Sequence, residues 1–217
     1  VVEYRLKDAE DTWTVAAADT VLNDDGNTTY VHGAYLAALT PGTNYEYRVG
    51  YGARRSEWYP LKTADGADFK ALIFPDSQSA DYGVWRDTAM PAWERNKDAQ
   101  FFINMGDLVD NGQASYQWNA WFDACEDMIC QIPVAPLDGN HETYDLNWNM
   151  HMPVSYTTLF NLPKNGLSKY PNQFYSFDYG DIHFTVMDTQ FTELKDFEPT
   201  LLDEETTWLI NDLKSTT

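Results

Sequence analysis

One stretch of the chain decides its fold: Phe101-Phe102-Ile103-Asn104-Met105-Gly106-Asp107-Leu108-Val109-Asp110. A mostly apolar run of buried-strand length passes directly into a glycine and two aspartates. Two similar runs, Phe69 to Phe74 and Ile132 to Leu137, lie before and after it, and each also ends in polar side chains. The chain therefore repeats a pattern in which a buried strand leads at once to residues that can bind ions.

The segments between these runs have helical spacing. Asp81 to Lys97 and Gln113 to Ile129 repeat apolar residues at the period of a helix. Alternation of strand and helix implies right-handed crossovers. The sequence therefore predicts an α/β domain with a largely parallel sheet.

The pattern changes again beyond the third apolar run. Phe174 to Tyr179 and Asp181 to Asp188 predict two antiparallel strands with Gly180 at their turn. Asp203 is expected to cap a last amphipathic helix that ends near Leu213.

Residues 1–63 have the pattern of a β-sandwich. Alternating runs such as Val1 to Leu6 and Tyr45 to Val49 are separated by turns such as Asn23 to Asn27. Leu39 to Tyr45 predicts a tyrosine corner, in which the Tyr hydroxyl bonds to backbone upstream. About five strands fit, whereas a sandwich needs about seven, so we expect a partial sandwich whose opening strands are missing. The small, polar residues from Thr63 to Asp68 predict a linker.

Three polar clusters follow the three apolar runs: Asp76 and Gln78, then Asp107 and Asp110, then Gly139-Asn140-His141-Glu142. Neighbouring parallel strands end at one edge of a sheet, so we expect the clusters to meet. Their oxygen and imidazole groups suit Zn, Mn, Fe or Mg. Two such ions can share a carboxylate, activate water and neutralise the charge of a phosphoryl group.

The excess of acidic over basic residues indicates which kinds of binding partner the protein is not expected to have. The chain has 14 Lys and Arg against 34 Asp and Glu, so 14 minus 34 gives a net charge of −20. Such a surface repels nucleic acid and anionic lipid, so neither is an expected partner. No apolar stretch reaches membrane-spanning length and no signal peptide opens the chain.

Several other residue types are expected to be structural. For Cys125 and Cys130 we favour two buried thiols over a local disulfide, and His151 and His183 are interpreted as structural. Most aromatic residues are expected in the core. Four lie close enough to the polar clusters to line a substrate cleft: Trp118, Trp121, Tyr144 and Trp148.

The three clusters resemble the first three motifs of the calcineurin-like metallophosphoesterase superfamily, Asp-x-Gln, Gly-Asp-x-x-Asp and Gly-Asn-His-Glu. The strand pair from Tyr175 to Phe184 and the preceding β-sandwich resemble its purple acid phosphatase branch. The resemblance implies a fibronectin type III-like domain over residues 1–63. A phosphoesterase domain of the αββα type is implied over residues 68–217.

The same resemblance implies roles for individual residues. Asp107 would bridge two metal ions, Asp76 would bind the first and Asn140 the second. His141 would give a proton to the leaving oxygen or hold the phosphate, without binding metal. Glu142 would orient His141 from the second shell.

Two positions depart from the family pattern. Gln78 stands where a His ligand is usual, so its amide could bind the first metal, act through a water, or do neither. Asp110 stands where purple enzymes carry a metal-binding Tyr, so we expect no purple chromophore. Asp110 is interpreted as a second-shell or a turn residue.

The family closes its site with further His ligands beyond the helix that corresponds to Asp203 to Leu213. This chain ends at Thr217 and begins at Val1, so we expect a processed or excised fragment. Asp107 and Asn140 alone are too few ligands for tight binding of a second transition metal. The fragment is expected to hold one metal or none and to be inactive or very slow.

The sequence thus predicts a dinuclear phosphomonoesterase, with two divalent or trivalent ions (Zn, Fe or Mn) in the whole protein. Its expected partner is a small phosphate ester, and its expected location is extracellular or the cell envelope. Two alternatives stay open: a phosphodiesterase or nucleotide hydrolase, and a non-catalytic extracellular binding module. The sequence does not indicate an oligomeric state.

Overall fold

The computed structural model describes residues 1–66, 68–79 and 81–216, so Ala67 of the predicted linker lies outside the described residues. The N-terminal part is all β. Its strands are β1 (Val2–Leu6), β2 (Trp13–Val15), β3 (Ala18–Leu22), β4 (Thr29–Gly33), β5 (Asn44–Tyr51), β6 (Arg54–Arg55) and β7 (Tyr59–Lys62). There are more of them than the five expected, because β2 and β6 are too short to show alternation in the sequence.

The N-terminal strands form two sheets. One has the order β2-β1-β5-β6, with β7 also paired to β5, and the other is the β3–β4 hairpin. The predicted tyrosine corner is confirmed, because the Thr40 backbone N–H donates to the buried Tyr45 hydroxyl at 3.0 Å. This bond fixes the chain where it enters β5, the strand with the most neighbours in its sheet.

The C-terminal part alternates strand and helix, as predicted. Its elements are β8 (Ala71–Pro75), α1 (Gly83–Arg95), β9 (Phe101–Met105), α2 (Ser115–Ile129), β10 (Val134–Leu137), η1 (His141–Thr143), α3 (Val154–Leu159), β11 (Tyr175–Tyr179), β12 (Ile182–Val186) and α4 (Leu201–Ser215). β8, β9 and β10 form a parallel sheet in the order β10-β9-β8. The α/β class is therefore confirmed.

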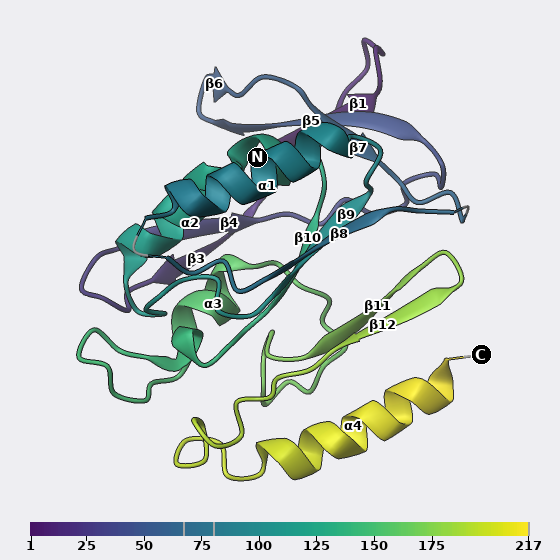
Figure 1. The fold of residues 1–217 in the computed structure, drawn as a ribbon. Coiled ribbons are helices and arrows are strands. Elements are labelled where there is room, and N and C mark those ends of the chain that lie inside the picture. The colour runs from purple at the N-terminus through teal and green to yellow at the C-terminus, as the bar shows by residue number, and fades with distance from the viewer. Residues whose placement is uncertain (67, 80, 217) are drawn as a thin grey trace.

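These elements stack in four layers (Figure 1). Helices α1 and α2 cover one face of the parallel sheet, the antiparallel β11–β12 hairpin covers the other, and α4 lies outside the hairpin. Two apolar cores separate the layers. In the first, the Trp85 and Trp121 rings stack at 5.9 Å between the helices and the sheet. In the second, Trp208 of α4 packs on Phe174 with ring centroids 4.8 Å apart.

The register of the parallel sheet brings its three strands to an end at one level. Pro75 of β8 and Leu137 of β10 are both paired with Met105 of β9. Residues that follow these three positions therefore leave the sheet side by side.

Three local features differ from the predictions or were not predicted. The N-cap residue of α4 is Thr200 and not the predicted Asp203. Asp203 lies in the first turn of the helix, where the positive end of the helix dipole stabilises a carboxylate. Neither η1 nor α3 was predicted from the sequence. Both cysteines are free thiols, but only Cys125 is fully buried. No helix in the described ranges is long and apolar enough to cross a membrane.

Candidate metal and phosphate site

The three polar clusters meet where the parallel strands end. Asp76 follows β8, Asp107 follows β9 and Asn140 follows β10. Backbone N–H groups of Ser77 and Gln78 donate to the Asp107 carbonyl at 3.1 and 2.8 Å. The predicted meeting of the clusters is confirmed by this register and these bonds.

The third cluster bonds to the side chain of the second. The His141 backbone N–H donates to Asp107 Oδ1 at 3.1 Å. Asp107 therefore contacts the first cluster through its carbonyl and the third through its carboxylate. It occupies the centre of the group.

The backbone at both candidate aspartate ligands is in the left-handed region. Asp76 has φ of 29° and Asp107 has φ of 48°, values that residues other than glycine rarely adopt. Such conformations persist only where the surrounding structure imposes them, and they gather at functional sites. Gly139 permits this arrangement, because a Cβ atom there would overlap the Asp107 carboxylate.

The buried carboxylate of Glu142 organises the loops of the site. It accepts backbone N–H groups from Gly139 at 2.6 Å, Leu108 at 2.8 Å, Asp107 at 3.0 Å and Val109 at 3.2 Å. Burial raises the pKa of Glu142 to about 8, while the N–H donors of Gly139, Val109 and Leu108 oppose the rise. These contacts correct its expected role, because Glu142 orients backbone rather than the His141 ring.

The His141 ring is oriented by Asp110 instead. Its Nδ1 lies 2.7 Å from the Asp110 carbonyl oxygen and 3.7 Å from Asp110 Oδ1. A carbonyl oxygen can only accept, so Nδ1 carries a hydrogen and donates it. Nε2 is then the ring atom available to a ligand. Asp110 thus acts on His141 mainly through its backbone, which a sequence motif does not reveal.

The donor set fits hard metal ions. Asp76, Gln78, Asp107 and Asn140 all supply oxygen. Gln78 Oε1 is buried and has no hydrogen-bond partner among the described residues, which is costly unless a ligand satisfies it. Asn140 Nδ2 donates to the Tyr144 hydroxyl at 3.4 Å, so its amide oxygen is left for an ion.

Carboxylate, imidazole and thiol groups alone do not complete a metal site. In residues 1–66, 68–79 and 81–216, no three His, Cys, Asp or Glu side chains are grouped so that they could hold an ion. The amide oxygens of Gln78 and Asn140 therefore remain candidate ligands beside the carboxylates of Asp76 and Asp107.

The four aromatic residues expected near the cleft divide into two pairs. Trp118 and Trp121 are fully buried, and their indole N–H groups donate to Gly112 O and Ser77 Oγ. Their position at helical spacing along α2 is the signal of a core residue. Tyr144 and Trp148 lie beside His141, with centroid distances to its ring of 5.4 and 6.2 Å.

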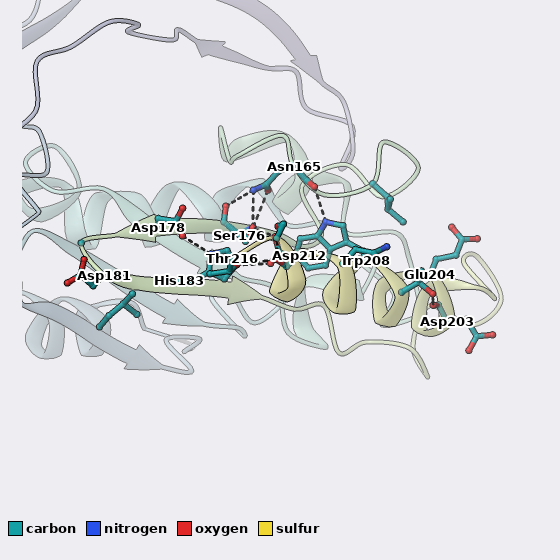
Figure 2. Close-up of a pocket in the computed structure, with 16 residues that line it drawn as sticks. Asn165, Ser176, Asp178, Asp181, His183, Asp203, Glu204, Trp208, Asp212 and Thr216 are labelled. Atoms are coloured by element: carbon teal, nitrogen blue, oxygen red, sulfur yellow. Dashed lines mark hydrogen bonds and ion pairs between the residues drawn. The ribbon is translucent and has the colours of Figure 1, made fainter.

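A separate cavity of about 1160 Å³ lies between the β11–β12 hairpin and α4. Figure 2 shows the polar network there, in which both ring nitrogens of His183 face carboxylates, Asp178 at 2.6 Å and Asp212 at 2.8 Å. None of the candidate metal ligands lines this cavity. These contacts fit the interpretation of His183 as structural, and His151 likewise bonds Asp24 at 2.8 Å.

Comparisons with known proteins agree with this architecture. A model of the calcineurin-like phosphoesterase family matches residues 69–211, and a model of the purple acid phosphatase N-terminal domain matches residues 1–63. Acid phosphatase type 7 of Mus musculus is 24% identical over 196 residues, covering 85% of this chain and 41% of that protein. "Probable inactive purple acid phosphatase 1" of Arabidopsis thaliana is 27% identical over 192 residues, covering 74% of this chain and 30% of that protein.

A solved structure has the same fold. The purple acid phosphatase PPD1 from yellow lupin (Lupinus luteus) seeds matches with a TM-score of 0.72 and 21% identity, over 86% of this chain and 39% of that chain. The chain thus has the layered α/β fold found in this class of protein. This chain belongs to the calcineurin-like phosphoesterase family, and its relatives are purple acid phosphatases. It spans less than half the length of these relatives.

Proposed function

We propose that the whole protein hydrolyses phosphate monoesters with two metal ions held at the carboxyl edge of the parallel sheet. The observation that carries this proposal is the direct bonding of the first and third clusters to Asp107 of the second. One relative is named as an acid phosphatase and another as a probable inactive purple acid phosphatase, so the activity is proposed from the site itself.

Each candidate ligand has a place in this proposal. Asp76 and Gln78 would hold one ion, Asn140 the other, and Asp107 would contact both. Bound Zn, Fe or Mn ions would supply Lewis acidity and neutralise charge on the phosphoryl group. They would also draw an anionic ester to a chain whose net charge is −20.

His141 is proposed as the proton donor to the leaving oxygen. Its Nδ1–H is held by the Asp110 carbonyl, so the ring cannot rotate without losing a bond at 2.7 Å. Nε2 would face the ester and, when the ring is doubly protonated, give its proton to the leaving oxygen. General acid catalysis of this kind contributes about a hundredfold to ten-thousandfold in rate.

The described residues offer only four candidate ligands for two ions. We therefore include in the proposal that these 217 residues alone bind metal weakly and hydrolyse esters slowly or not at all. A location outside the cytoplasm, extracellular or in the cell envelope, is proposed from the purple acid phosphatase relatives. Cell fractionation with an antibody to the protein tests that location.

The decisive experiment measures metal content and hydrolysis of p-nitrophenyl phosphate by the whole protein. We expect Asp107→Asn to lower kcat by roughly a hundredfold or more and to reduce bound metal. The control is Asp87→Asn, an exposed aspartate on α1. Unchanged activity and metal content in Asp107→Asn would refute the proposal. Parallel assays with bis(p-nitrophenyl) phosphate decide between monoesters and diesters.

A further inference from the structure

Trp148 is placed unusually for a large aromatic side chain. It is 54% exposed, and its φ of 65° is in the left-handed region, which bulky residues avoid. Its ring lies 5.7 Å from the half-buried Tyr144 ring, and both rings lie near His141. Together Tyr144 and Trp148 form a surface, the aromatic wall, that continues outward from the proposed site.

The loop that carries the aromatic wall is preorganised by Asp145. Its Oδ1 accepts the backbone N–H groups of Asn147 and Asn149, each at 2.8 Å. The Trp148 N–H donates to the Asp145 carbonyl at 2.9 Å, and Tyr144 forms a β-bridge with Met150. The strained conformation of Trp148 is therefore held by hydrogen bonds on both sides of it.

The N-terminal β3–β4 turn supports the same loop. Asp24 is nearly buried and faces His151 Nε2 at 2.8 Å and Ser155 Oγ at 3.2 Å. Gln113 Nε2 donates to the Asp24 carbonyl at 2.9 Å, while Gln113 Oε1 accepts the Leu146 N–H at 2.8 Å. Asp24 thus contacts both the far end of the loop and the residue that fixes its beginning.

We propose that the aromatic wall binds a flat aromatic ring carried by the leaving group, such as a nucleobase or an aryl ring, and that Asp24 positions the wall. This inference rests on the proposed function, since it takes the reacting ester to lie at His141. The group bonded to the leaving oxygen must extend from the atom that His141 Nε2 protonates. The phenol and indole rings lie 5.4 and 6.2 Å from the His141 ring, centroid to centroid, and offer an aromatic face and edge beside it.

Two phosphate esters test the wall while keeping the reacting oxygen the same. Adenosine 5′-monophosphate and ribose 5-phosphate share the ester and the sugar and differ in the base. Both esters are substrates under the proposed function, so their apparent affinities are measured as Michaelis constants of phosphate release by the whole protein with Mn²⁺ present. Adenosine, which has no phosphate, is measured by calorimetry. Stacking of one base on an aromatic side chain predicts that Trp148→Ala lowers the affinity ratio of the two esters about tenfold.

A matched control separates a local effect from a general one. Trp13→Ala removes an indole of similar exposure, 48%, from the N-terminal sheet and should leave the ratio unchanged. Trp148→Phe keeps an aromatic ring and should retain most of the wild-type affinity ratio of the two esters. Asp24→Asn should lower the ratio in the same direction, with thermal unfolding measured beside it, and a loss of stability without a change in ratio would refute the positioning role.

The outcomes distinguish the two proposals. If Trp148→Ala changed the affinities for both esters equally, or changed neither affinity, the proposed role of the aromatic wall would be overturned. Failure of the wild-type protein to hydrolyse ribose 5-phosphate would instead overturn the phosphoesterase site. In that case the binding of adenosine tests the aromatic wall on its own. Weaker adenosine binding in Trp148→Ala than in wild type would support the wall. No adenosine binding, or equal binding by both proteins, would overturn it.

Discussion

The carboxylate of Glu142 accepts four backbone N–H groups that belong to two of the three clusters. We predict that Glu142→Gln lowers the free energy of unfolding by roughly 2–4 kcal/mol, because an amide nitrogen would face N–H donors in a buried place. Urea denaturation at pH 9, above the pKa of about 8 to which burial raises Glu142, measures the change with the carboxylate ionised. The same substitution at the exposed Glu10 is the control and should be nearly neutral. Equal midpoints for Glu142→Gln and wild type would show that the four bonds contribute little.

The close approach of Gly139 to Asp107 leads to a second prediction at the residue scale. A Cβ atom there would overlap the Asp107 side chain, so Gly139→Ala should displace the carboxylate and weaken Mn²⁺ binding by about tenfold or more. Titration calorimetry checks the affinity. Gly33→Ala is the matched control, since its Cβ would make only ordinary contact with Asn161. Wild-type affinity in Gly139→Ala would mean that Asp107 does not need its observed position.

At the scale of elements, His183 joins the β11–β12 hairpin to α4. Hydrogen bonds with Asp212 and then Asp178 raise the pKa of His183 above its usual value, and both ring nitrogens donate only in the charged form. A raised pKa in the folded state stabilises the protein below the unfolded value of about 6.5, and this stabilisation is lost as pH rises through the folded pKa.

We expect the wild-type protein to melt at a higher temperature than His183→Gln, and this difference in melting temperature should be larger at about pH 6 than at about pH 9. Thermal unfolding followed by circular dichroism at both pH values measures the difference. His32→Gln serves as the control, because the His32 and Asp19 side chains are both largely exposed. A pH-independent difference for His183→Gln would contradict a charged His183.

Elements with a clear period could be predicted from the sequence, and contacts between distant residues could not. Phe101 to Met105 matches β9 residue for residue, and both crossover helices lie inside their predicted ranges. The meeting of Asp76, Asp107 and Asn140 followed from strand order alone. The hydrogen bonds of Glu142 and Asp24 could not be predicted from the sequence pattern, because each carboxylate bonds to backbone or side chains of segments that are distant in the sequence. The roles of the candidate ligands stay predictions.

The whole molecule is held together by contacts between its N-terminal sheets and the α/β part. The Tyr47 hydroxyl donates to the Cys130 carbonyl at 2.9 Å, and Asp25 Oδ2 accepts the Ser115 N–H at 2.9 Å. The N-cap residue of α2, Ala114, offers no side-chain cap. A residue of the β3–β4 turn therefore caps the helix that precedes β10.

Asp25→Ala should lower the free energy of unfolding by about 1 kcal/mol through loss of this cap. Burial raises the pKa of Asp25, but hydrogen bonds from Ser115 and Asn27 outweigh it and lower the pKa to about 2. The stabilisation is present above the unfolded value of about 3.9 and is lost as pH falls through the folded pKa. Urea unfolding at neutral pH tests this, with the exposed Asp11→Ala as control. An unchanged free energy of unfolding in Asp25→Ala would show that this cap contributes little to stability.

The common level at which β8, β9 and β10 end limits which changes of chain length the family can tolerate. Extra residues in α1, α2 or their outer loops would leave Pro75, Met105 and Leu137 aligned. Loss of a single residue within β9 would draw Asp107 back along its strand and turn the following side chain to the opposite face. Insertions and deletions among homologues should therefore be frequent between the strands and absent within them.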